Sequence, residues 1–93
     1  MTSVSGSTQR ERDMRSYLSK KLTRPLPTKD GGTLRTVVDA RAYMLRLSKD
    51  RERSAQWQRA AQLLLAKADV GAFSRQLELA LLYDGKLDVR AMA

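Results

Sequence analysis

Apolar side chains recur at helical spacing over most of this 93-residue chain, and no stretch alternates apolar with polar residues for long enough to predict a strand. Met14, Leu18 and Leu22 repeat at every fourth position and predict a first helix over residues 9–22. The apolar stripe of this helix is narrow, and such a helix is not stable by itself. We therefore expect it to form a basic arm rather than a part of the core.

Prolines interrupt the helical pattern after this first segment. Pro25 and Pro27 cannot continue a helix, because proline lacks the backbone donor and holds the residue before it in an extended conformation. The sequence Asp30-Gly31-Gly32 that follows is typical of a turn. We interpret residues 23–32 as a linker between the arm and the rest of the chain.

Three further helices are predicted beyond the linker. The second covers residues 34–47, the third runs from about residue 50 to residue 68, and the fourth covers residues 70–83 with Asp69 as its N-cap. The third helix has a single apolar face, and Trp57 on that face is expected to be buried. The second and fourth helices are apolar around most of their circumference, which indicates burial on more than one side.

These elements predict an all-α fold in one domain, a small three-helix bundle over about residues 33–89 with an additional basic N-terminal helical arm. Residues 1–8 are rich in Ser, Thr and Gly and are expected to be a disordered tail, and residues 90–93 are expected to be frayed.

The fourth helix presents a second apolar face, which a bundle of this size has little surface left to cover. Phe73 and Leu77 are expected to point into the core. The opposite face carries the residues of a candidate protein interface, which are Leu79, Tyr83, Ala72 and Leu82. In the second helix Arg41 falls within the apolar arc, where either its stem packs while its head reaches water, or it pairs with a carboxylate.

Charge changes the picture, because Lys and Arg exceed Asp and Glu by eight. The excess lies in residues 1–60, and residues 61–93 are neutral. A candidate basic patch consists of Arg10, Arg12, Arg15, Lys20, Lys21, Arg24, Arg46, Lys49, Arg51, Arg53 and Arg59. If these side chains converge, they form a surface for phosphate groups. A compositional bias toward Arg, with no Ile and no Asn in the chain, explains the same charge without a function.

Several classes of chemistry are excluded or disfavoured by the residues themselves. The chain has neither Cys nor His, so it lacks thiolate and imidazole groups for catalysis or zinc binding. Gly85-Lys86 lacks the remaining residues of a phosphate-binding loop. A helix-turn-helix over residues 60–82 would present only Arg75 and Gln76 to a DNA groove. We therefore predict no catalytic residue, no metal site and no cofactor.

Two functions remain as hypotheses. The first is a non-enzymatic protein-interaction or regulatory module that binds a protein partner or forms a homo-oligomer through its two-sided apolar helices. The alternative is a basic protein that binds nucleic acid, without sequence preference, through residues 10–59. Membrane binding is not expected, because the first helix has a narrow apolar stripe, and a cytoplasmic location is expected because no secretory signal pattern is present.

Overall fold

The structure is a computed structural model that describes residues 12–92. The tail predicted over residues 1–8, Arg10 and Ala93 lie outside the described residues. The chain is helical over residues 12–18. The elements that follow are β1 (Lys21–Thr28), β2 (Gly32–Thr36), α2 (Val37–Leu45), α3 (Lys49–Glu52), α4 (Ala55–Leu65), α5 (Val70–Tyr83) and α6 (Val89–Met92).

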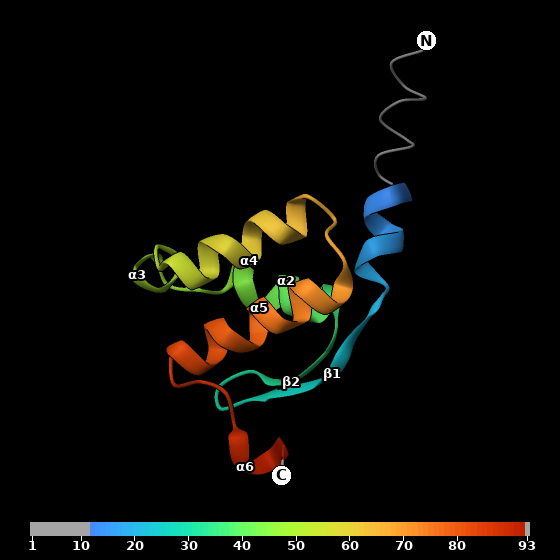
Figure 1. Ribbon diagram of the computed structural model, residues 1–93. Coiled ribbons are helices and arrows are strands. Elements are labelled where there is room, and N and C mark those ends of the chain that lie inside the picture. The colour runs from blue at the N-terminus through green and yellow to red at the C-terminus, as the bar shows by residue number, and fades with distance from the viewer. Residues whose placement is uncertain (1–11, 93) are drawn as a thin grey trace.

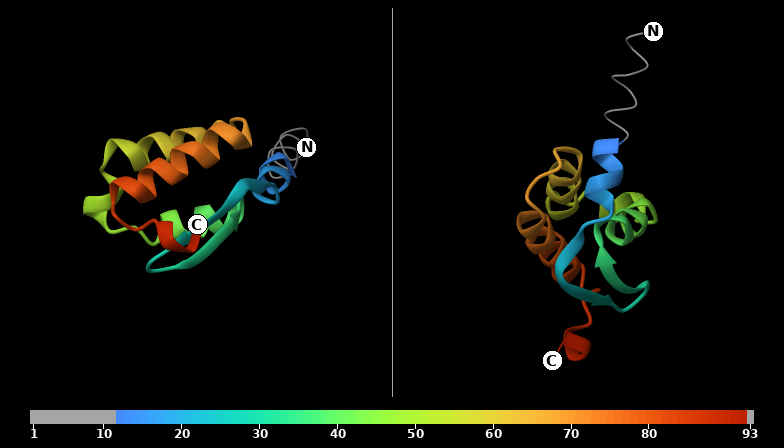
Figure 2. Two further views of the ribbon diagram at one scale, coloured as in Figure 1. Left: turned by 60° about the horizontal axis from the view of Figure 1, so that its bottom comes forward. Right: turned by 90° about the vertical axis from the view of Figure 1, so that its right-hand side faces the viewer.

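The helices and the hairpin form two layers with the core between them. Figure 2 shows α4 and α5 side by side over the layer that contains β1, β2 and α2. In Figure 1 the α5 helix lies between α4 and the hairpin, and it packs on both. The N-terminal helix joins the core through Tyr17, whose ring meets the edge of Phe73 at a centroid distance of 6.4 Å.

The all-α prediction is wrong, because β1 and β2 form a two-stranded antiparallel sheet. The strands span most of the segment interpreted as a linker and extend into the predicted first and second helices. Leu26 pairs with Leu34, and both side chains are buried. Pro25 is tolerated because it lies at an irregularity of the ladder between Lys21 and Leu26, in a sheet whose two strands are both edges. The turn uses Gly32, whose φ of +77° suits glycine.

Three predicted helices also have different limits in the structure. The first ends at residue 18 rather than residue 22, and Leu22 lies in β1. The second begins at Val37 rather than residue 34, because Thr36 and Asp39 form a capping box there. The third is divided into α3 and α4, and Ser54 caps the second part by accepting a hydrogen bond from the amide of Trp57. Residues 89–92 form α6 rather than a frayed end.

Other predictions are confirmed. The α5 helix has the limits expected from the sequence, and Asp69 caps it by accepting hydrogen bonds from the amides of Gly71 and Ala72. Trp57 is 1% exposed, and its ring lies 5.7 Å from that of Tyr43 in α2. The prediction that helices pack on one another therefore holds for α4 and α5. The hairpin, which was not predicted, contributes Leu26 and Leu34 to the same core.

Candidate interaction surfaces

A network of polar side chains holds four helices and the hairpin turn together. Asp84, which follows α5, accepts hydrogen bonds from Trp57 Nε1 at 2.6 Å and from Arg51 Nε at 2.8 Å. Arg51 Nη2 also donates to the Tyr43 hydroxyl at 2.8 Å. That hydroxyl donates in turn to Asp30 Oδ1 in the hairpin turn at 2.9 Å. The network therefore sets how α2, α3 and α4 meet the end of α5.

The polar groups of this network are occupied by one another. Burial raises the pKa of Tyr43, and its hydroxyl already has both a donor and an acceptor partner. The adjoining cavity has a volume of about 70 Å³, which leaves little room for a substrate. Arg51 is thus a bonded member of the network, in contrast to its predicted place among free surface cations.

The outer face of α5 carries the residues predicted as a protein interface. Leu79, Leu82 and Tyr83 are 47%, 55% and 72% exposed, and Ala72 is exposed at the start of the same stripe. Arg75 is the one charged residue among the exposed positions of α5. We call these five residues the α5 stripe. No residue of 12–92 covers them, and the inner face of α5 is buried independently of them.

A second apolar surface lies between α2 and α4. It includes part of the second helix, which the sequence predicted to be apolar on more than one side, whereas the contribution of α4 was not predicted. It is a groove of about 360 Å³ whose rims include Leu45 and Leu65, which are 70% and 73% exposed. Trp57 and Leu64 form part of its lining. Arg41 lines the same groove with an exposed side chain, which agrees with the interpretation that its head reaches water.

The predicted basic patch is divided between two ends of the molecule. One group lies on the N-terminal helix and β1 and consists of Arg12, Arg15, Lys20, Lys21 and Arg24. The other group lies around α3 and α4 and consists of Arg46, Lys49, Arg51, Arg53 and Arg59. Figures 1 and 2 place α3 and the N-terminal helix at opposite ends of the α4–α5 pair. The two groups therefore do not form a single surface.

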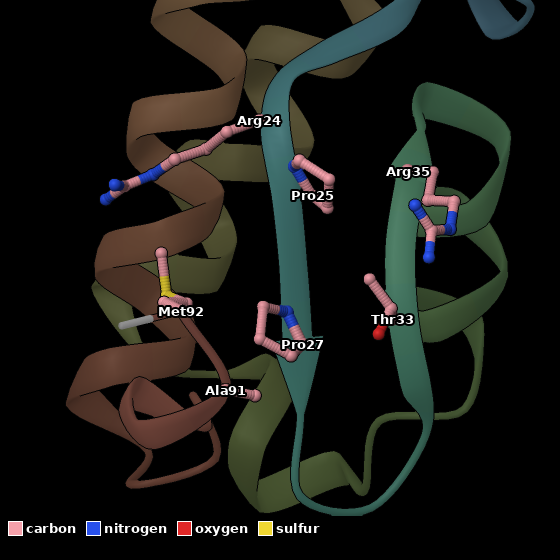
Figure 3. Close-up of a pocket in the computed structure, with 7 residues that line it drawn as sticks. All are labelled: Arg24, Pro25, Pro27, Thr33, Arg35, Ala91 and Met92. Atoms are coloured by element: carbon pink, nitrogen blue, oxygen red, sulfur yellow. The ribbon is translucent and has the colours of Figure 1, made fainter.

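A hollow of about 330 Å³ lies on the outer side of the hairpin. Figure 3 shows the residues that line it. Pro25 and Pro27 of β1 lie opposite Arg35 and Thr33 of β2. Arg24 reaches away from the prolines over α5, where its Nη2 lies 2.6 Å from Glu78 Oε2. Arg35 was not among the predicted patch residues. The sequence placed it inside the second helix, whereas the structure places it on β2.

The described residues offer no site for a metal ion, since no three carboxylate side chains gather anywhere in residues 12–92. Within the same range no helix has the length and apolarity needed to cross a membrane. Comparison of the chain with protein-family models, with curated proteins and with solved structures found no match.

Proposed function

We propose that this chain is a non-enzymatic protein-interaction module that forms a dimer through the α5 stripe. The observation that supports the proposal is the exposure of Leu79, Leu82 and Tyr83 on a helix whose opposite face is buried in the core. Contiguous apolar side chains on a rigid element are typical of protein interfaces. The stripe presents them without any rearrangement of the fold.

A second copy of the chain is the partner that the stripe fits best. In a two-fold arrangement with antiparallel α5 helices and Leu79 near the axis, Arg75 of each copy lies opposite Tyr83 of the other. An arginine over a tyrosine ring is a favourable cation–π contact. Ala72 adds no bulk at the end of the stripe, which permits close approach. The only charge in the stripe thus meets an aromatic face instead of an apolar surface or a like charge.

The dimer is tested by measuring molar mass by light scattering over a range of protein concentrations, for the wild type and for Leu79→Glu. Leu79 is 47% exposed, so dimer formation can bury about half of its surface in each copy. Removing this burial from both copies should weaken the binding free energy by about 1.5–3 kcal/mol. The lost burial alone should raise the dissociation constant by about 10- to 100-fold. Desolvation of the new carboxylate should raise it further. The helical circular dichroism should be unchanged, because Leu79 does not contribute to the core.

Leu65→Glu is the matched control, because it places the same charge at an exposed leucine of α4 outside the stripe. This variant should dimerise like the wild type. A wild type that remains monomeric at about millimolar concentration, where even weak dimers with Kd near 1 mM form, would refute the proposal. Dissociation by Leu65→Glu and not by Leu79→Glu would assign the interface to the α2–α4 groove instead.

A further inference from the structure

The positive charge of the described chain is concentrated in about its first third. Residues 12–36 contain seven Lys and Arg side chains and two Asp, a net charge of +5. Residues 37–92 contain ten basic and seven acidic side chains, a net charge of +3 over more than twice the length. The N-terminal helix and the hairpin therefore form the basic part of the molecule.

The basic side chains of the hairpin differ in how they are neutralised. Arg24 is paired with Glu78, and Asp30 lies within ion-pair distance of Arg51 and Lys86. In contrast, Lys20, Lys21 and Arg35 are exposed, and no carboxylate of residues 12–92 lies within 4.0 Å of their charged atoms. We call these three residues the ribbon cluster.

The pairing of the strands brings the ribbon cluster to one end of the hairpin. Lys21 is the partner of Thr36 in the ladder, so Arg35 and Lys21 lie on neighbouring strands at the end away from the turn. Lys20 directly precedes Lys21. Asp39, the acidic residue at the start of α2, uses one carboxylate oxygen to accept hydrogen bonds from the amides of Arg35 and Thr36. Backbone amides thus hold this carboxylate most strongly, and the charge of Arg35 adds a smaller electrostatic contribution.

The outer face of the hairpin is open to a large partner. Figure 2 shows the hairpin at the edge of the molecule, with α4 and α5 on its inner side. The outer face bears Arg35, Thr33, Pro25 and the hollow of Figure 3, and α6 borders this hollow through Ala91 and Met92. A two-stranded antiparallel ribbon has a width that enters the major groove of B-form DNA, which is about 12 Å wide.

We propose that this outer face binds duplex DNA, with the ribbon cluster contacting backbone phosphates. Unpaired Lys and Arg side chains are complementary to the regularly spaced charges of the duplex. The exposed face lacks Asn and Gln, and its two prolines offer no donor to a base edge, so binding is sequence-tolerant. The proposal is independent of dimerisation, because the α5 stripe lies on a different element.

The test measures fluorescence anisotropy of a labelled duplex of about 20 base pairs, titrated with protein at several salt concentrations between about 50 and 200 mM. The test variant combines Lys20→Gln, Lys21→Gln and Arg35→Gln. The matched control combines Arg46→Gln, Lys49→Gln and Arg53→Gln, which removes the same charge from exposed positions at the opposite end of the molecule. Thermal melts followed by circular dichroism establish that both variants are folded.

We expect the wild type to bind with an affinity that falls steeply with salt. Loss of three phosphate contacts should reduce the slope of log affinity against log salt concentration by about 2.7, and the control should keep the wild-type slope. If the triple variant does not fold, Lys21→Gln alone should reduce the slope by about 0.9, with Lys49→Gln as its control. Arg35→Lys, which keeps the charge, should bind like the wild type.

Three results would overturn the proposal. Absence of wild-type binding at about 50 mM salt, where phosphate contacts are strongest, would show that the face does not bind DNA. If affinity and the salt dependence of affinity fall equally in the test variant and in the control, binding depends on the net charge of the whole molecule. A labelled single strand of the same length is titrated in the same way. Tighter binding of this strand than of the duplex would show that the ribbon does not occupy a groove.

Discussion

Trp57→Phe removes one hydrogen-bond donor from the centre of the protein and keeps an aromatic ring in its place. Trp57 is 1% exposed, and its indole nitrogen donates to Asp84 Oδ2 at 2.6 Å. A hydrogen bond to a charged acceptor contributes about 1.5–3 kcal/mol to stability. The deleted ring atoms add about 1 kcal/mol for lost burial and for the space left behind.

We therefore expect the free energy of unfolding to fall by about 3 kcal/mol, which corresponds to a decrease in Tm of more than about 10 °C in a domain of this size. The measurement is urea unfolding followed by far-ultraviolet circular dichroism, because Trp57 is the only tryptophan and its fluorescence is lost in the variant. Gln62→Ala, at an exposed position of the same helix, is the control and should change stability by less than about 0.5 kcal/mol.

A second substitution identifies the cause of the loss. In Asp84→Ala the acceptor is absent, so adding Trp57→Phe should cost about 1–2 kcal/mol less than it costs in the wild type. A loss of under about 1 kcal/mol in Trp57→Phe, or additive losses in the double variant, would refute the assigned role of this hydrogen bond.

Three further changes test local features of the fold. The buried Tyr17 hydroxyl has no hydrogen-bond partner among the described residues, so Tyr17→Phe should leave stability unchanged or raise it by up to about 1 kcal/mol, and a clear loss in a thermal melt would contradict this. Hydrogen bonds from the backbone amides of Arg35 and Thr36 lower the pKa of Asp39 below its ordinary value of 3.8. Asp39→Ala should therefore lower the free energy of unfolding at pH 7 by about 1 kcal/mol. In urea unfolding this difference should shrink as the pH falls below 3.8 and through the lowered pKa of Asp39. A difference that is constant with pH would exclude a contribution from the charge of Asp39 to the capping box. Gly32→Ala should cost about 1 kcal/mol in a thermal melt, since φ is +77° there and no atom lies within 4 Å of the added methyl group, and an unchanged Tm would mean that the turn relaxes.

Features that depend on residues close together in the chain could be predicted from the amino-acid sequence. The periodic apolar positions of α5 and the cap at Asp69 were predicted with the limits that the structure has, because a helix face and its cap involve residues a few positions apart. The burial of Trp57 was predicted for the same reason. The absence of Cys and His is likewise a property of composition, and no fold changes it.

The hairpin was missed because its local signals favour a different interpretation. Pro25 and Pro27 oppose a central strand, and Leu34 continues the apolar pattern of the helix that follows it. These residues form strands because Leu26 and Leu34 are buried in the common core, where β1 packs on α5 and β2 packs on α2. The amide of Thr23 also donates to the buried Ser74 hydroxyl of α5. Tertiary packing here outweighs local propensity.

Only the tertiary structure decided which side chains meet and which remain free. Asp84 receives Arg51 and Trp57 from 33 and 27 positions earlier in the chain, and Arg24 finds Glu78 at 54 positions' distance. The division of the predicted basic patch and the exposure of Arg35 on β2 follow from the same packing. Sequence periodicity reports the face on which a side chain lies, while the partner on that face depends on how distant elements pack, and no local pattern records this.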